Sequence, residues 1–240
     1  MNIQGLWVGS KLSALERLSI NSYLSNDYTF DLYSYTNISG VPDGVNILDA
    51  NTILPHRYVS TNPGPAVGKP TRNYGAFSDW FRWKLLYEKG GYWSDLDMVM
   101  LKPYDFDTPY VFSSEDIGGY DYANCNVLYA PADAPIMEKA MGIAGTACKQ
   151  GDVPWCSVGP DLLRRLMKKY ALRKYMQPSR VFCPIHCDKI GWMVDDNTVA
   201  LPTDSYAVHF WTSLWGSYGL DRDAIYPYGS LIETLKRRYS

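Results

Sequence analysis

The first 35 positions of the chain carry two different spacings of hydrophobic residues. Residues 3–8 are mostly apolar, and Leu12, Leu15 and Leu18 then recur at the spacing of one helix face. Residues 28–35 form another short stretch, rich in aromatic side chains. We predict a strand over 3–8, a helix over 12–24 and a strand over 28–35. This is a βαβ unit, which favours parallel strands joined by a right-handed crossover.

The rest of the pattern predicts further alternation of strands and helices. Glycines and prolines dominate residues 36–75, which we expect to be mostly loop with a short helix over 47–54. A helix over 76–89 should end at Gly90 and Gly91, and an extended segment should follow over 92–101. Ser230 and Glu233 fit a capping box. Further strands are expected at 110–113, 126–130, 180–184 and 207–211, and further helices at 134–147, 160–170 and 230–239. No repeat or linker divides the chain, so we predict one α/β domain over residues 1–240.

Composition and charge narrow the functional classes. The charged fraction of 20% and hydrophobic fraction of 46% are typical of a globular protein. The net charge of −2 lacks the basic excess of a nucleic-acid-binding protein. No stretch approaches the roughly 20 apolar residues of a membrane helix, and no secretory leader is recognisable. We therefore expect a cytoplasmic protein without a transmembrane segment; its oligomeric state stays open.

The cysteines favour reduced thiols. Five is an odd number in a chain long enough to need no disulfides. Cys183, His186 and Cys187 lie close together in sequence, but no CxxC pair completes a zinc site. We favour free thiols over zinc.

Two carboxylates form the most informative pair. Asp95 and Asp97 are two residues apart, so in an extended segment they project to the same side. A hard divalent cation, Mn²⁺ or Mg²⁺, would relieve their repulsion and could hold a diphosphate. Two solvated acids in a turn are the alternative.

A second charged pair lies on the preceding helix. Asp79 and Arg82 are three residues apart and share one face of an otherwise aromatic helix. Charged side chains on such a helix must either pair with each other or bind a ligand. Either the two form an intrahelical ion pair, or Asp79 accepts from sugar or ribose hydroxyls and Arg82 donates to the sugar or diphosphate.

Residues 77–98, FSDWFRWKLLYEKGGYWSDLDM, resemble the signature of the DXD-containing sugar-binding glycosyltransferases of the family 32 type. Relatives of that family include α-1,4-glycosyltransferases and the clostridial glucosylating toxins. The shared elements are Ser-Asp, the Arg three residues on, Gly-Gly-Tyr and Asp-x-Asp. The resemblance implies a GT-A fold with a Rossmann-like, mostly parallel sheet flanked by helices. It also implies a nucleotide-sugar donor, usually manganese, and retention of configuration.

The resemblance also assigns residues outside that segment. It places Trp7 against the uracil ring, although a core Trp is an equal alternative. It gives His209 as a third metal ligand beside Asp95 and Asp97, and Ser213 and Trp215 as donors to the β-phosphate; Trp211 is left to the core. Residues 1–103 would bind the nucleotide sugar, and residues 104–240 would supply the acceptor side and a C-terminal metal and phosphate loop. Asn124 and Asn126 match an Asn-rich strand that lines the donor sugar in the family.

The leading hypothesis is a metal-dependent glycosyltransferase. It would move a hexose from a nucleotide-diphosphate sugar, a UDP-sugar, to a glycan or other hydroxyl acceptor, with Asp79, Arg82 and Asp97 as catalytic residues. The enzyme could be peripheral to a membrane that carries the acceptor. A non-catalytic glycan- or nucleotide-binding module and a metal-dependent nucleotidyltransferase are the alternatives. The residues do not select the sugar, the acceptor or the linkage.

Overall fold

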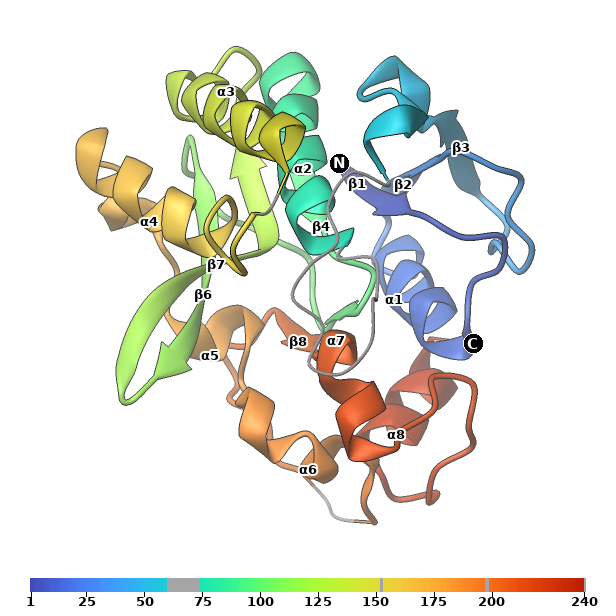
Figure 1. Ribbon diagram of the computed structural model, residues 1–240. Helices are drawn as coiled ribbons and strands as arrows, with labels where there is room; N and C mark the ends of the chain where they lie inside the picture. Colours follow the sequence, from blue (N-terminus) through green and yellow to red (C-terminus); the bar gives the residue numbers. More distant parts are fainter. Residues whose placement is uncertain (60–73, 152, 197–198, 240) are drawn as a thin grey trace.

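A six-stranded sheet runs through the centre of the protein (Figure 1). The computed structural model describes residues 1–59, 74–151, 153–196 and 199–239. The strand order is β3-β2-β1-β4-β7-β6, and a separate two-stranded sheet pairs β5 with β8. The strands are β1 (Asn2–Trp7), β2 (Thr29–Ser34), β3 (Val45–Asp49), β4 (Gly91–Ser94), β5 (Met98–Met100), β6 (Val111–Ile117), β7 (Tyr120–Ala130) and β8 (Ala207–His209).

The sheet is mainly parallel. β1 pairs in parallel with β2 and β4, and β2 with β3, whereas β7 runs antiparallel to β4 and β6. The predicted strand–helix–strand opening with parallel strands is therefore confirmed. Because β7 pairs with β4, the sheet crosses the division between residues 103 and 104 that the sequence suggested.

Helices flank the sheet, and α2 and α3 lie side by side in Figure 1. The Ser13 hydroxyl and the Glu16 carboxylate form a capping box at the start of α1. Within the described residues, no helix is long and apolar enough to cross a bilayer. The helices are α1 (Ala14–Leu24), α2 (Tyr74–Lys89), α3 (Pro135–Gln150), α4 (Pro160–Lys169), α5 (Ser179–Phe182), α6 (Gly191–Val194), α7 (Thr212–Trp215) and α8 (Leu231–Arg238), with 3₁₀ turns η1 (Ala50–Thr52), η2 (His56–Tyr58), η3 (Arg173–Tyr175), η4 (Cys187–Lys189) and η5 (Gly216–Tyr218).

Two hydrophobic cores form on opposite faces of the sheet because side chains alternate along each strand. Tyr92 packs into the core that contains α1 and α8, and its neighbour Trp93 packs into the core beneath α2 and α3. In β7, Val127 packs into the same core as Tyr92, and its neighbour Leu128 packs into the same core as Trp93. A sheet covered on both faces is what the α/β pattern predicted.

Several predicted elements are wrong in type or extent. Residues 45–49 form β3 instead of a helix, because pairing with β2 overrides the local sequence; only the 3₁₀ turn at 50–52 is helical. Residues 180–184 are not a strand, since 179–182 form α5, and short apolar runs do not distinguish the two. The predicted loop continues through residues 60–73, which lie outside the described residues.

The strands β6 and β7 are longer than predicted and form a hairpin. Gly118 and Gly119 both have positive φ, 63° and 86°, which a two-residue hairpin turn requires. At the chain end, Ser230 caps α8 through Glu233 N, but the Glu233 carboxylate binds Tyr226 N, so the predicted capping box is only half formed.

Candidate active site

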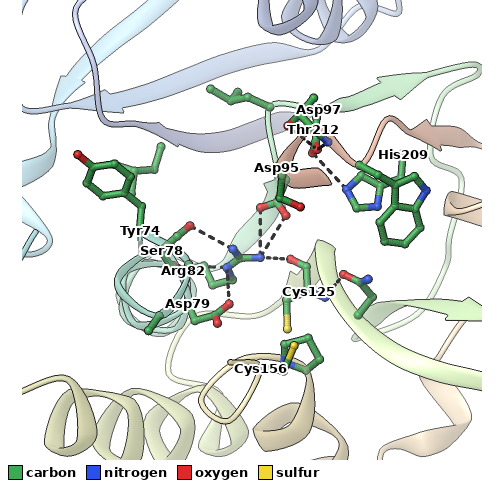
Figure 2. A pocket seen from close by; sticks show the side chains of 18 of the residues that line it. Tyr74, Ser78, Asp79, Arg82, Asp95, Asp97, Cys125, Cys156, His209 and Thr212 are labelled. Carbon is green, nitrogen blue, oxygen red and sulfur yellow. Dashed lines mark hydrogen bonds and ion pairs between the residues drawn. The ribbon is translucent and has the colours of Figure 1, made fainter. Parts of the chain in front are cut away.

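A cavity of about 500 Å³ opens where β1 and β4 end, beside the first half of α2 (Figure 2). Side chains from the turn between β4 and β5, from the β6–β7 hairpin, from the loop before α4 and from the end of β8 complete its wall. Every residue that the sequence assigned to the site, except Trp215 and Asn126, lines this cavity. These are Trp7, Asp79, Arg82, Asp95, Asp97, Asn124, His209 and Ser213.

Arg82 is the centre of a buried polar network. Its Nη1 lies 3.1 Å from Asp95 Oδ1 and also donates to the backbone carbonyl of Cys125. Its Nε lies 3.4 Å from Asp79 Oδ1, and its Nη2 donates to the Ser78 hydroxyl at 3.1 Å. Burial works against the Arg82 charge, but Asp95 and Asp79 hold its pKa above the ordinary value. The intrahelical pair exists, and the same guanidinium also faces the cavity.

Asp79 is held against the amino end of α4. The Asp79 side chain is 12% exposed, and a Cβ on Gly159, the N-cap of α4, would lie 2.3 Å from Asp79 Oδ2. Only glycine allows the backbone to approach the carboxylate this closely. Burial raises the pKa of Asp79 to about 6, although Arg82 opposes the shift.

Asp95 lies in a turn and not in an extended strand. β4 ends at Ser94 and β5 begins at Met98, so the premise that placed Asp95 and Asp97 on one side of an extended segment is wrong. Both carboxylates nevertheless line the cavity, and neither is solvated: their side chains are 29% and 13% exposed. Trp93 Nε1 donates to Asp95 Oδ1 at 2.9 Å. Burial raises the pKa of Asp95, against the opposing effect of Arg82.

Asp97 meets His209 through the small sheet. The register of β5 and β8 sets Met98 opposite His209, and His209 Nε2 lies 3.3 Å from Asp97 Oδ1. The other oxygen, Oδ2, accepts from Thr212 N and Thr212 Oγ1, both at 2.9 Å. Burial opposes both charges, but each stabilises the other, so the pKa of Asp97 lies below and that of His209 well above the ordinary range.

Asp95, Asp97 and His209 are the candidate ligands of a divalent metal ion. In their present positions, no three His, Cys, Asp or Glu side chains of the described residues form a metal site. The chemistry still fits, because two carboxylates and an imidazole at one cavity are ligands that Mn²⁺ accepts. Asn126 also fits: its Nδ2 lies 3.0 Å from His209 Nδ1, while its buried Oδ1 has no hydrogen-bond partner. A ligating Nε2 needs a proton on Nδ1, and a rotated Asn126 amide would accept it.

The cysteine-histidine cluster does not form a zinc site. Cys183 Sγ accepts from Asn126 Nδ2 at 3.0 Å, whereas His186 Nδ1 lies 2.6 Å from Asp188 Oδ1. All five cysteines are free.

The three tryptophans that the sequence analysis discussed differ in whether they reach the cavity. Trp7 lines the cavity, is half-buried, and donates its indole N–H to Lys11 O. Trp215 is 1% exposed, and its Nε1 donates to Phe210 O at 2.6 Å. This corrects the predicted phosphate contact of Trp215, because its donor is already used in the core. Trp211 is buried as expected, but it also lines the cavity, with its ring centroid 3.9 Å from that of His209.

Sequence reasoning missed several residues of the site. Thr212 and the Cys125 carbonyl gave no signal, because they reach their partners only through the tertiary structure. Trp93 is two residues before Asp95, next to the end of β4, and its closeness to the DXD motif in the sequence is a signal that could have found it. Glu115 was not missed, because it follows the strand predicted at 110–113 and was expected on the acceptor side. It lines the cavity, accepts from Asn124 Nδ2 at 3.0 Å, and has its pKa raised by burial.

The chain is similar to known glycosyltransferases in sequence and in fold. Residues 14–118 match the model of the family described as glycosyltransferase sugar-binding region containing DXD motif. The structure of the PaToxG glycosyltransferase is similar, with a TM-score of 0.53 and 21% identity over 70% of this chain and 69% of that chain. That of the galactosyltransferase LgtC, in complex with donor and acceptor sugar analogs, has a TM-score of 0.49 and 11% identity over 88% and 87%. No curated protein sequence matches the chain.

The mainly parallel sheet flanked by helices is a GT-A-type fold, and the DXD motif lies in the cavity at the edge of this sheet. The match to the family of glycosyltransferase sugar-binding regions that contain a DXD motif is limited to residues 14–118 of the chain. The resemblance, the fold class and the transferase activity that the sequence indicated are thus confirmed.

Proposed function

We propose that the protein transfers a hexose from a UDP-sugar to a hydroxyl acceptor, with a divalent metal ion and with retention of configuration. The observation that carries this proposal is the convergence of Asp79, Arg82, Asp95 and Asp97 on one cavity. The DXD family generally uses a divalent metal and a nucleotide sugar. A buried guanidinium next to two carboxylates suits a ligand that carries both phosphates and hydroxyls.

Each residue has a role in binding the donor. Asp95, Asp97 and His209 would hold Mn²⁺ or Mg²⁺, which when bound supplies Lewis-acid stabilisation of the leaving diphosphate. Arg82 offsets the same negative charge, and Asp79 accepts from sugar hydroxyls. Trp7 stacks on the uracil ring, and Ser213 donates to the β-phosphate.

The reaction breaks one bond at the anomeric carbon and forms another. The acceptor hydroxyl attacks on the face from which UDP leaves, and its proton passes to the departing phosphate oxygen. Arg82 lies in a buried, preorganised network, so it needs little reorganisation as charge develops on UDP. Attack on the same face without a covalent intermediate gives retention.

The test measures the products that the purified protein releases from UDP-glucose, UDP-galactose, UDP-N-acetylglucosamine and GDP-mannose. We expect release of UDP that needs Mn²⁺, stops with a chelator, and is lost in Asp97→Asn. The matched control is Asp43→Asn, which changes an exposed aspartate outside the cavity. Pyrophosphate as the product would instead establish a nucleotidyltransferase. Donor binding without turnover by the folded protein would establish a non-catalytic module.

A further inference from the structure

A second cavity, of about 540 Å³, lies between the tip of the β6–β7 hairpin and the segment from α5 to α6. In Figure 1, the hairpin and α5 lie next to each other, and the two elements are also in contact. Asp116 and Gly118 line the cavity on the hairpin side, and Arg180, Lys189 and Trp192 line it on the other. None of these residues belongs to the donor cavity.

The two cavities are neighbours. Glu115 and Cys187 line the donor cavity, whereas the adjacent residues Asp116, His186 and Asp188 line the second one. Glu115 and Asp116 are adjacent in β6 and project to opposite faces of the strand, so β6 lies between the two cavities. Cys183 lines the second cavity, and its Sγ lies 3.9 Å from Nδ1 of His209, which lines the donor cavity. A ligand in the second cavity is therefore held next to the donor cavity.

The second cavity is lined by two positively charged side chains, Arg180 and Lys189, and by two negatively charged ones, Asp116 and Asp188. Arg180 Nε lies 2.6 Å from Asp204 Oδ2, and His186 Nδ1 lies 2.6 Å from Asp188 Oδ1. Asp116 Oδ1 accepts from Gly119 N at 3.1 Å. Equal numbers of positive and negative side chains provide many hydrogen-bond donors and acceptors but no net attraction for an anion. This favours a neutral ligand with many hydroxyl groups.

Trp192 gives the cavity an apolar surface. Its neighbours in α6, Met193 and Val194, are buried, but Trp192 is 50% exposed, and Lys189 Nζ lies 4.6 Å from the centre of its ring. An indole combines a large apolar face with a polar edge, which suits a molecule that is apolar on one face and hydroxylated at its rim. Such a molecule is a sugar ring.

We propose that the second cavity is the acceptor subsite and that it binds a neutral oligosaccharide. A distal sugar ring stacks on Trp192, and the hydroxyl that attacks the donor lies beyond Glu115 and Cys187. This inference rests on the proposed glycosyltransferase function, and it names the substrate class of that same site. A protein acceptor is disfavoured because the cavity is lined mainly by charged and polar side chains.

The experiment separates saccharide binding from transfer. Binding is followed without donor by saturation-transfer NMR with four neutral trisaccharides, built of glucose, N-acetylglucosamine, galactose and mannose. Sugar transfer to the same trisaccharides is followed with whichever UDP-sugar the protein converts to UDP in the donor test. The variants are Trp192→Ala and Trp192→Phe. The control is Tyr228→Ala, since Tyr228 is 77% exposed and lines neither cavity.

We expect at least one trisaccharide to bind. Trp192→Ala should raise the acceptor KM at least about tenfold, and Trp192→Phe should recover most of the loss, since it keeps an apolar aromatic face for the sugar ring. Tyr228→Ala should resemble the wild type. The proposal is overturned if no trisaccharide binds while UDP is released, if Trp192→Ala binds and accepts normally, or if only proteins or anionic glycans accept the sugar. If a trisaccharide binds and the binding depends on Trp192, but no UDP is released, the proposed transferase function is refuted while the saccharide-binding site is retained.

Discussion

Arg82 joins helix α2 to the DXD turn, since its Nη1 lies 3.1 Å from Asp95 Oδ1. The same guanidinium lies 3.4 Å from Asp79, so a single buried cation balances two buried carboxylates. Trp93 stacks against it, with the guanidinium carbon 4.9 Å from the ring centre. Residues that the donor would contact are therefore also residues that hold the fold together.

Removing Arg82 should therefore lower stability as well as activity. The sequence alone led us to expect that Arg82→Ala would weaken donor use without disturbing the core. The structure revises this, because the variant leaves Asp79 and Asp95 buried without their partner. We expect a loss of about 3–5 kcal/mol in the free energy of unfolding, measured by denaturant titration. Arg57→Ala, which removes an exposed arginine, should change it by less than about 0.5 kcal/mol. Equal stabilities for the two variants would contradict the network.

His209→Ala should raise the manganese concentration needed for half-maximal activity by at least about tenfold, because one ligand of the proposed metal is lost. The measurement is UDP release across a manganese titration. Asn126→Ala should cause a smaller rise, since Asn126 orients the His209 ring from behind. His56→Ala is the control, because His56 is exposed and lies outside the cavity. If His209→Ala keeps the wild-type manganese requirement, His209 is a core residue only.

Asp79 should make stability depend on pH. Its pKa is raised from 3.8 to about 6, so between these values the folded state binds more protons than the unfolded state. The free energy of unfolding should consequently fall as pH rises from about 4 to 6, by up to about 3 kcal/mol from this group. The raised pKa values of Asp95 and Glu115 act in the same direction. The quantity to measure is therefore the difference in free energy of unfolding between the wild type and Asp79→Asn at each pH. Parallel stability curves for the two proteins would show that Asp79 titrates normally.

Gly159→Ala should displace the Asp79 carboxylate, because the new Cβ would lie 2.3 Å from Oδ2. We expect a loss of about 1–3 kcal/mol in stability and a higher donor KM. Gly142→Ala is the matched control, since its Cβ would meet nothing within 4 Å and lies in α3, where alanine favours the helix. Both variants are compared by thermal unfolding and by UDP release. A Gly159→Ala protein as stable and active as Gly142→Ala would mean that the loop before α4 moves away without cost.

The sequence by itself determined the parts of the site that lie within one continuous segment. Asp79, Arg82, Asp95 and Asp97 all fall between residues 77 and 98, where helical spacing, the Gly90–Gly91 stop and the two acids can be read directly. The opening strand–helix–strand unit was predictable for the same reason, because its hydrophobic period is local.

The tertiary structure alone decided which distant groups meet these residues. The register of β5 and β8 brings His209 and Thr212 to Asp97, and the amino end of α4 brings Gly159 to Asp79. Pairing with β2 also makes residues 45–49 a strand, and the Trp215 indole donates to Phe210 O in the core instead of facing the cavity. These outcomes depend on sheet pairing and backbone hydrogen bonds between residues up to 115 positions apart. Local propensity does not encode such partners, because they gain their energy only when the whole chain is folded.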